Sequence, residues 1–234
     1  MKHFFLILLF FLSSTLGFSQ DRRTVKFVDE YLNVGFREIH GVKQPIAKWS
    51  SDIKTLKYKI VGEFQYMNEK NWDKYLLGIE ELTGIKLIRT YQDDFKILIF
   101  FGEIDDYLEF SNNDIPFNIA NKFSTWNNRK YHSDYSLKST SFCIVPAKIK
   151  DGNKGIFWLK RGILHGFGLL GEIEYESSIF YKYLTATNTR LSRKDKRYIK
   201  LHYNQAIKPG TNYGEVKQTL LNLSNIKELS KERL

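Results

Sequence analysis

The chain has 234 residues, of which 42% are hydrophobic, and a formal net charge of +10. This is enough apolar material for one domain with a proper core, and the single cysteine, Cys143, excludes an intramolecular disulfide. The basic residues are scattered along the chain, which argues against a nucleic-acid partner, because such a site needs basic residues and aromatic rings on one surface.

The first 19 residues are typical of a cleavable secretory signal peptide. Lys2 and His3 precede an apolar run over residues 4–12, and the small residues Gly17 and Ser19 stand where a signal peptidase needs them, before Gln20. The run is shorter than the roughly 20 residues that cross a bilayer, and no cysteine directly follows it to carry a lipid. We therefore expect an exported protein, periplasmic or secreted, with no transmembrane segment after signal cleavage.

Residues 20–53 predict a lead-in with little regular structure and at most one strand, because turn signals stand at Gly41 and Pro45. The main domain is expected over residues 54–205. Alternating apolar residues predict its first strand over 55–64. Apolar residues at spacings of three and four then predict an amphipathic helix over 68–82, followed by Gly84 as a stop signal.

Two further strands are expected over 85–90 and 95–101. The second is almost entirely apolar, which predicts a central place in the sheet. Residues 111–135 are rich in Asn, Ser and Asp and predict a long loop across the sheet edge. A strand over 137–145 follows, with Cys143 as a buried residue, and then a buried helix over 153–170.

An exposed helix is expected over 192–205, with Ser192 as its N-cap and Asp195 at its third position. The basic run over residues 190–200 would be the solvated face of this helix. Residues 206–234 predict a C-terminal extension with an amphipathic helix over 214–231. The elements together predict an α+β fold, in which helices pack on a mixed twisted sheet beside a small C-terminal helical part.

The helix expected over 153–170 carries a motif that continues just beyond it, Arg-Gly-Ile-Leu-His-Gly-Phe-Gly-Leu-Leu-Gly, from Arg161 to Gly171. It resembles the active-site helix of metzincin zinc metallopeptidases, His-Glu-x-x-His-x-x-Gly-x-x-His, in which three histidines bind zinc and the glutamate is the general base. When Gly168 is aligned with the glycine that turns the chain, His165 falls on the second histidine.

Two downstream segments extend the resemblance. Residues 177–181, Ser-Ser-Ile-Phe-Tyr, are similar to the turn beneath the metal, with Phe180 at the methionine position. Residues 191–203 are similar to the closing helix of matrix-type members, and Pro209 and Gly210 follow as in a family of uncharacterised secreted bacterial domains that resembles metzincins. The resemblance spans residues 54–205 and implies a zincin-type fold.

The departures from the motif imply a loss of the usual activity. Arg161 stands at the first ligand position, Gly162 at the general-base position and Gly171 at the third ligand position. A lone imidazole cannot hold zinc where three protein ligands are needed, and Arg161 would place a permanent positive charge at the cation site. Without a carboxylate at Gly162, a bound water has no general base. We therefore expect no cofactor and no zinc.

His165 has two interpretations. It is either a core histidine whose ring nitrogens bond to the backbone, or a ligand in an unorthodox metal site with Glu172, Glu174 and Glu176. A solvated loop is the simpler interpretation of the three glutamates.

The glycines of the motif also have a structural interpretation. Gly162, Gly166 and Gly168 would permit close packing between helix and sheet, since a helical glycine is usually kept for a steric reason. His132 and His202 stand among polar residues and are assigned no role.

Three functions are open at this point. The leading hypothesis is a catalytically inactive, metzincin-like exported protein whose cleft binds a peptide or another cell-envelope component along a sheet edge. The second is a hydrolase with a rearranged site, in which His165, a nearby glutamate and Arg161 as an electrophile carry the reaction; it predicts a metal or a perturbed carboxylate beside His165. The third is a structural envelope protein with a filled apolar cleft.

Overall fold

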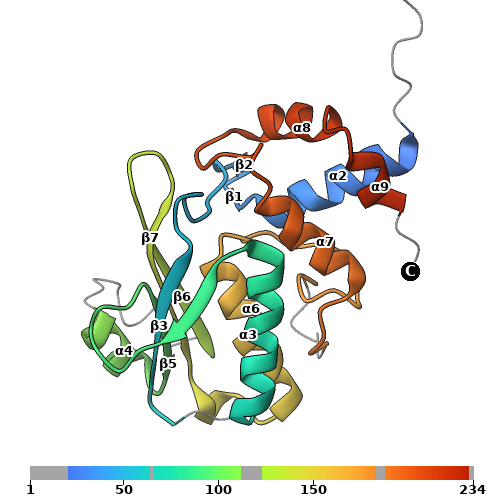
Figure 1. The fold of residues 1–234 in the computed structure, drawn as a ribbon. Helices are drawn as coiled ribbons and strands as arrows, with labels where there is room; N and C mark the ends of the chain where they lie inside the picture. Colours follow the sequence, from blue (N-terminus) through green and yellow to red (C-terminus); the bar gives the residue numbers. More distant parts are fainter. Residues whose placement is uncertain (1–20, 64–65, 112–122, 183–187, 232–234) are drawn as a thin grey trace, which may run out of the picture.

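The computed structural model describes residues 21–63, 66–111, 123–182 and 188–231 (Figure 1). The predicted signal peptide therefore lies outside the described residues. The described part is an α+β structure built around one mixed sheet, which confirms the predicted class.

The sheet has five strands in the order β4-β3-β5-β7-β6. The pairs β3–β4, β3–β5 and β5–β7 are parallel, and β6 runs antiparallel to β7 at the edge. All five residues of β5 are buried, which confirms its predicted central place. The strands are β3 (Thr55–Val61), β4 (Lys86–Arg89), β5 (Ile97–Phe101), β6 (Thr125–Tyr131) and β7 (Leu137–Ile144).

Helices cover both faces of this sheet (Figure 1). α3 (Glu69–Thr83) and α6 (Gly152–Gly166) lie on one face, and α4 (Ile104–Ser111) lies on the other. Alternate residues of β5 divide between the two cores: Ile99 belongs to the large cluster under α3 and α6, whereas Leu98 belongs to a small cluster under α4. Cys143 is fully buried in the small cluster, as predicted.

Caps fix the ends of the predicted helices. Asn68 accepts from the backbone N–H of Asn71 at 2.9 Å to begin α3, and Gly84 ends it in the left-handed conformation. Asp151 caps α6, which ends at Gly166, four residues before the predicted end. A short 3₁₀ turn, η1 (Pro146–Lys148), separates β7 from α6.

The prediction for residues 20–53 was wrong. α2 (Arg22–Gly35) occupies the first part, capped by Asp21, and a small antiparallel pair follows, β1 (Glu38–Ile39) with β2 (Val42–Lys43). The helix forms because its apolar residues gather on one face, which is buried against the C-terminal helices. The buried residues of α2 are Thr24, Phe27, Val28, Tyr31, Leu32, Val34 and Gly35.

The C-terminal part also differs from the prediction. The expected single helix over 214–231 is two helices, α8 (Tyr213–Leu221) and α9 (Ile226–Lys231). α7 (Arg193–His202) has the predicted Ser192 cap, but only one face is exposed, because Tyr198, Ile199 and His202 are buried. Together with α2, these helices gather at one end of the sheet (Figure 1). Their buried residues belong to the large cluster, so the lead-in and the extension share the core of the main domain.

The predicted loop over 111–135 was wrong in its second half, where β6 pairs with β7 along its whole length. Residues 112–122 of that prediction lie outside the described residues. β6 escapes pattern recognition because five of its seven residues are half-buried and two are exposed, as suits an edge strand.

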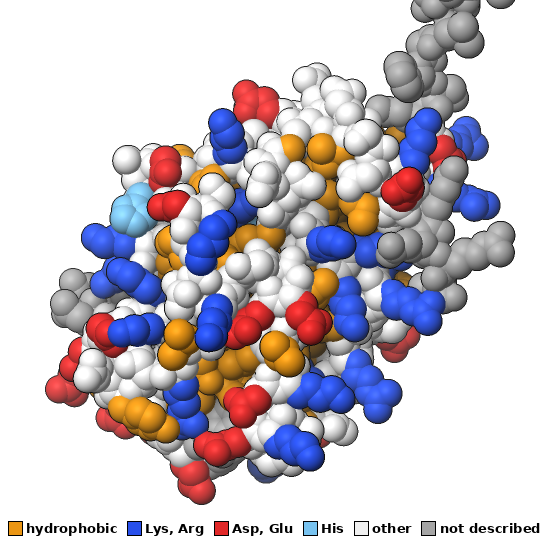
Figure 2. Space-filling view, viewed as in Figure 1, with side chains coloured by type: hydrophobic (Ala, Val, Ile, Leu, Met, Phe, Trp, Pro, Cys, Tyr) orange, Lys and Arg blue, Asp and Glu red, His pale blue; other side chains and the backbone are white. Residues whose placement is uncertain are grey.

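The charged side chains are mixed over the surface drawn in Figure 2, where Lys and Arg alternate with Asp and Glu. This agrees with the scattered basic residues of the sequence. Among the described residues, no helix is both long enough and apolar enough to cross a membrane.

Candidate functional site

The motif from Arg161 to Gly171 covers the second half of α6 and the turn that follows. Gly162 lies directly against β7: a Cβ atom there would stand 2.7 Å from the ring of Phe142. Gly166 is similarly close to Thr140, with 3.1 Å between the added Cβ and Oγ1. These glycines therefore provide the close helix-to-sheet packing expected of them, and the ring of Phe142 fills the space at the general-base position.

The third ligand position is closed by backbone. Gly171 donates its N–H to the carbonyl oxygen of Val34 at 2.8 Å, at the end of α2. A Cβ atom on Gly171 would lie 1.8 Å from the carbonyl oxygen of Asn33, far inside contact distance. The turning glycine, Gly168, has φ +88° and packs in the same way on the carbonyl of Ala47. A histidine at position 171 would require the backbone of α2 to move.

Arg161 and His165 lie one turn apart on α6 and are hydrogen-bonded. Arg161 Nε donates to His165 Nε2 at 3.3 Å, its Nη1 donates to the carbonyl of Tyr181 at 2.7 Å, and its Nη2 pairs with Glu172 at 2.6 Å. The Arg161 side chain is only 4% exposed, whereas that of Glu172 is 51% exposed. Because Nε2 accepts from a permanent donor, the imidazole is neutral in this arrangement.

The electrostatics keep His165 neutral. Burial holds its pKa well below the ordinary value, and the positive charges of Arg161, Arg129 and Arg37 lower it further. Burial also lowers the pKa of Arg161, against the opposing effect of Glu172, but a guanidinium stays charged at any ordinary pH. The partner of the imidazole is thus Arg161, whereas the core-histidine interpretation expected backbone groups.

The three glutamates do not converge on His165. Glu172 is held by Arg161, Glu174 is exposed and pairs with Lys182, and Glu176 is exposed. Within the described ranges, no group of three or more His, Cys, Asp or Glu side chains is placed to hold a metal ion. The geometry therefore favours the solvated-loop interpretation of these residues.

Two arginines of the site were missed from the sequence. Arg129 of β6 is paired with Thr140 of β7, whose hydroxyl faces Gly166 of α6, so Arg129 lies on the α6 face of the sheet. Arg37 precedes β1 and lines a pocket of about 110 Å³. Burial lowers the pKa of Arg129, its charge interaction and hydrogen bond with Tyr131 oppose this shift, and the charge of Arg37 lowers the pKa further.

Phe180 and the turn around it are joined to α7 by one buried carboxylate. Asp195 accepts from the hydroxyl of Ser178, from the backbone N–H of Ile179 at 3.2 Å and from that of Ser192 at 2.8 Å. Phe180 itself is fully buried. The turn and the closing helix, which resemble metzincin segments separately, are therefore one hydrogen-bonded unit, and Arg161 is attached to it through Tyr181.

His202 has a structural role that the sequence did not predict. It is fully buried, and its Nε2 donates to the carbonyl of Ala47 at 3.0 Å while the Tyr31 hydroxyl donates to Nδ1 at 3.2 Å. Burial and the charge of Lys48 lower its pKa to about 3. The residue is therefore buried rather than set in a polar surface region, because tertiary packing encloses it.

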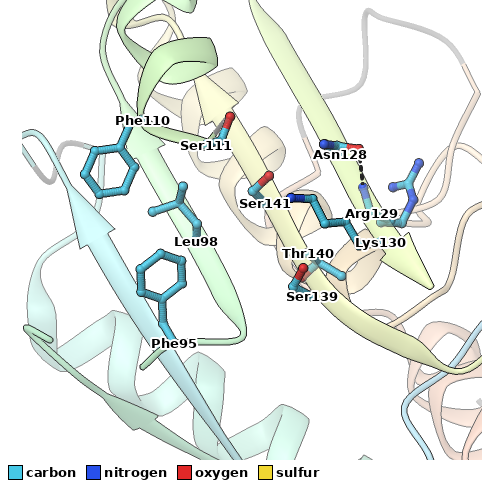
Figure 3. A pocket seen from close by; sticks show the side chains of 10 residues that line it. All are labelled: Phe95, Leu98, Phe110, Ser111, Asn128, Arg129, Lys130, Ser139, Thr140 and Ser141. Carbon is cyan, nitrogen blue, oxygen red and sulfur yellow. Dashed lines mark hydrogen bonds between the residues drawn. The ribbon is translucent and has the colours of Figure 1, made fainter. Parts of the chain in front are cut away.

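A second hollow, of about 190 Å³, lies on the opposite face of the sheet (Figure 3). Phe95, Phe110 and Leu98 form one side of it, and the Arg129 side chain is directed away from them. Ser141 is hydrogen-bonded to the Tyr107 hydroxyl at 2.7 Å, and burial raises the pKa of that phenol to about 12. Among the described residues, no His, Asp or Glu side chain is hydrogen-bonded to this hydroxyl pair, so we place the candidate site on the α6 face.

The fold and site thus define an α+β protein in which a buried arginine and a neutral histidine occupy the motif of α6. The sequence matches no protein-family model and none of the curated proteins with which it was compared. The functional argument therefore rests on the residues themselves.

Proposed function

We propose that this is an exported, metzincin-like protein that has lost catalysis and that binds a peptide or another cell-envelope component along the β6 edge of the sheet. Export is inferred from the signal-peptide pattern of residues 1–19. The observation that carries the loss of catalysis is the hydrogen bond from Arg161 to His165, which occupies the imidazole nitrogen that a metal would need.

The zincin-type fold is supported by the way the three motif segments meet. The motif lies on α6, the segment with Phe180 passes next to Arg161, and Asp195 ties that segment to α7. The strand and helix order before them, β3-α3-β4-β5 and then β7-α6, is the order predicted from the sequence. Fold similarity alone does not give a function, so the site must supply it.

Loss of catalysis is also supported by the packing of the two glycines. Phe142 fills the general-base position at Gly162, and the carbonyl of Asn33 closes the third ligand position at Gly171. Either ancestral side chain would need neighbouring groups to move. A zinc hydrolase of the usual kind has three protein ligands and an open fourth position, and the described residues supply neither.

Binding is supported by the position of β6. It is the edge strand beside α6, so one side of its backbone is unpaired within the described sheet. The backbone N–H of Arg129 donates to the neighbouring Asn128 side chain at 2.7 Å, a local bond that an incoming strand can replace. A peptide that adds to a sheet edge gains backbone hydrogen bonds without any metal.

The test is an NMR titration of the isotope-labelled chain without residues 1–19. The probe is a pool of random N-acetylated pentapeptides, half with free and half with amidated C-termini, and mass spectrometry follows the pool. We expect shifts of the β6 backbone amides and intact peptides. Shifts confined to other elements, or cleavage of the pool, would contradict the proposal; cleavage would favour the hydrolase.

A further inference from the structure

We infer that the β6 edge selects peptides by their C-terminal carboxylate, which lies between Arg37 and Arg129 while the last side chain enters the neighbouring apolar pocket. This inference rests on the proposed peptide-binding function and names the class of ligand for the same site.

The charge balance of the site calls for an anion. Arg161 has Glu172 as its counter-ion, but among the described ion pairs neither Arg37 nor Arg129 has a carboxylate partner. His165 is neutral and offers no negative charge. Like charges near a desolvated site cost free energy unless an opposite charge joins them, and arginine forks bind carboxylates in a bidentate way.

The position of the arginines points to the end of a peptide. Arg129 belongs to the edge strand that an added peptide would follow, and its side chain lies on the α6 face and is hydrogen-bonded to Tyr131. Two residues further along β6, Tyr131 lines the 110 Å³ pocket together with Arg37. A chain that runs along β6 therefore reaches the arginines and the pocket at one place.

The pocket supplies the second recognition element. Its walls include Pro45, Ala47, Leu170 and the rings of Tyr131 and Tyr135, with Arg37 at one side. The volume suits one apolar side chain rather than a larger group. Glu172, which stays beside Arg161, would repel a phosphate dianion more than it repels a single carboxylate, so a carboxylate fits the site better.

The test compares acetyl-Ala-Ala-Leu with a free carboxylate, the same peptide as its C-terminal amide, and acetyl-Glu-Ala-Leu amide, by calorimetric titration. We expect the free acid to bind at least tenfold more tightly than either amide. Arg37→Gln and Arg129→Gln should each weaken binding of the acid about tenfold and leave binding of the amide unchanged. Arg22→Gln, an exposed arginine at the start of α2, makes the same charge change away from the site and should have no effect.

Because Arg129 is half-buried, thermal unfolding first checks that Arg129→Gln is folded. Arg37 is exposed, so Arg37→Gln carries the test if Arg129→Gln does not fold. Equal binding of acid and amide with shifts in β6 would overturn the carboxylate inference and keep the proposed function. If acetyl-Glu-Ala-Leu amide and the free acid bind equally well, a side-chain carboxylate serves as well as a C-terminal one, and the inference that the C-terminus is recognised is overturned. No binding of any of the three peptides would overturn the inference, and an unshifted β6 in the pentapeptide titration would show that the proposed function has failed as well.

Discussion

Gly171 and the carbonyl oxygen of Asn33 are so close that a Cβ atom on the glycine would lie 1.8 Å from that oxygen. The end of α2 therefore occupies the space that a third histidine ligand would need. This contact joins the lead-in, residues 20–53, to the motif of residues 161–171, although the two were predicted as separate segments.

Gly171→Ala should lower the free energy of unfolding by about 3 kcal/mol, because the methyl group forces the backbone of α2 away from the turn. Urea denaturation gives the value. The control is Gly78→Ala in the interior of α3, where an added Cβ has no neighbour within 4 Å and helix propensity predicts a gain of up to about 1 kcal/mol. Similar effects of the two variants would contradict the packing argument.

Asp195→Ala should cost about 3 kcal/mol, because it leaves the buried hydroxyl of Ser178 and the N–H groups of Ile179 and Ser192 without their acceptor. Asp93→Ala removes an exposed carboxylate paired with Lys59 and should change stability by less than about 1 kcal/mol. Thermal unfolding of both variants checks the difference. A small effect at Asp195 would mean that the turn around Phe180 is held by packing alone.

The central elements could be predicted from the sequence because their signals are local. β3, α3, β4, β5, β7 and α6 are close to their expected places, since alternation, helical spacing and caps such as Asn68 act within a few residues. α2 was not predicted, because the turn signals at Gly41 and Pro45 follow it closely and its burial depends on the distant C-terminal helices. β6 was missed because a half-exposed edge strand with Asn127 and Lys130 lacks alternation.

The site was predictable only in part. One short stretch of chain holds Arg161, His165 and Glu172, and the motif of residues 161–171 includes or adjoins all three. Arg37 and Arg129 reach the same place from distant segments, and no local pattern marks an arginine whose neighbours are decided by tertiary packing. His202 was placed in polar surroundings for the same reason, because the groups that bury it, Tyr31 and Ala47, come from the N-terminal part.

Stability should fall as the pH is lowered from 7 to 5. The pKa of His202 is lowered to about 3 in the folded protein and that of His165 lies well below its ordinary value. The unfolded chain therefore binds protons below pH about 6.5 that the folded chain does not, at a cost of up to about 1.4 kcal/mol per pH unit for each histidine. Urea midpoints at pH 7, 6 and 5 measure this slope.

His202→Gln keeps a side-chain N–H for the Ala47 carbonyl and should remove about half of that pH dependence. His132→Gln, at an exposed position, should leave it unchanged. A flat profile for the unmodified chain would show that His165 and His202 do not carry the acid sensitivity.

Arg161→Gln should raise the pKa of His165, because the nearest positive charge is removed. Burial, the larger cause of the shift, remains, so the pKa should stay below its ordinary value. NMR titration of the His165 ring resonances measures the change, with Arg22→Gln as the control. An unchanged pKa would mean that Arg161 does not act on the imidazole.

The zinc content of the purified chain without residues 1–19, after dialysis against trace zinc, tests the central claim most directly. The claim is that the α6 motif no longer forms a metal site, because Arg161 occupies the imidazole and Gly171 cannot be replaced by a ligand. We predict less than about one zinc per ten chains, with the same value for His165→Ala. One zinc per chain that is lost in His165→Ala would contradict the claim and restore the hydrolase as the leading function.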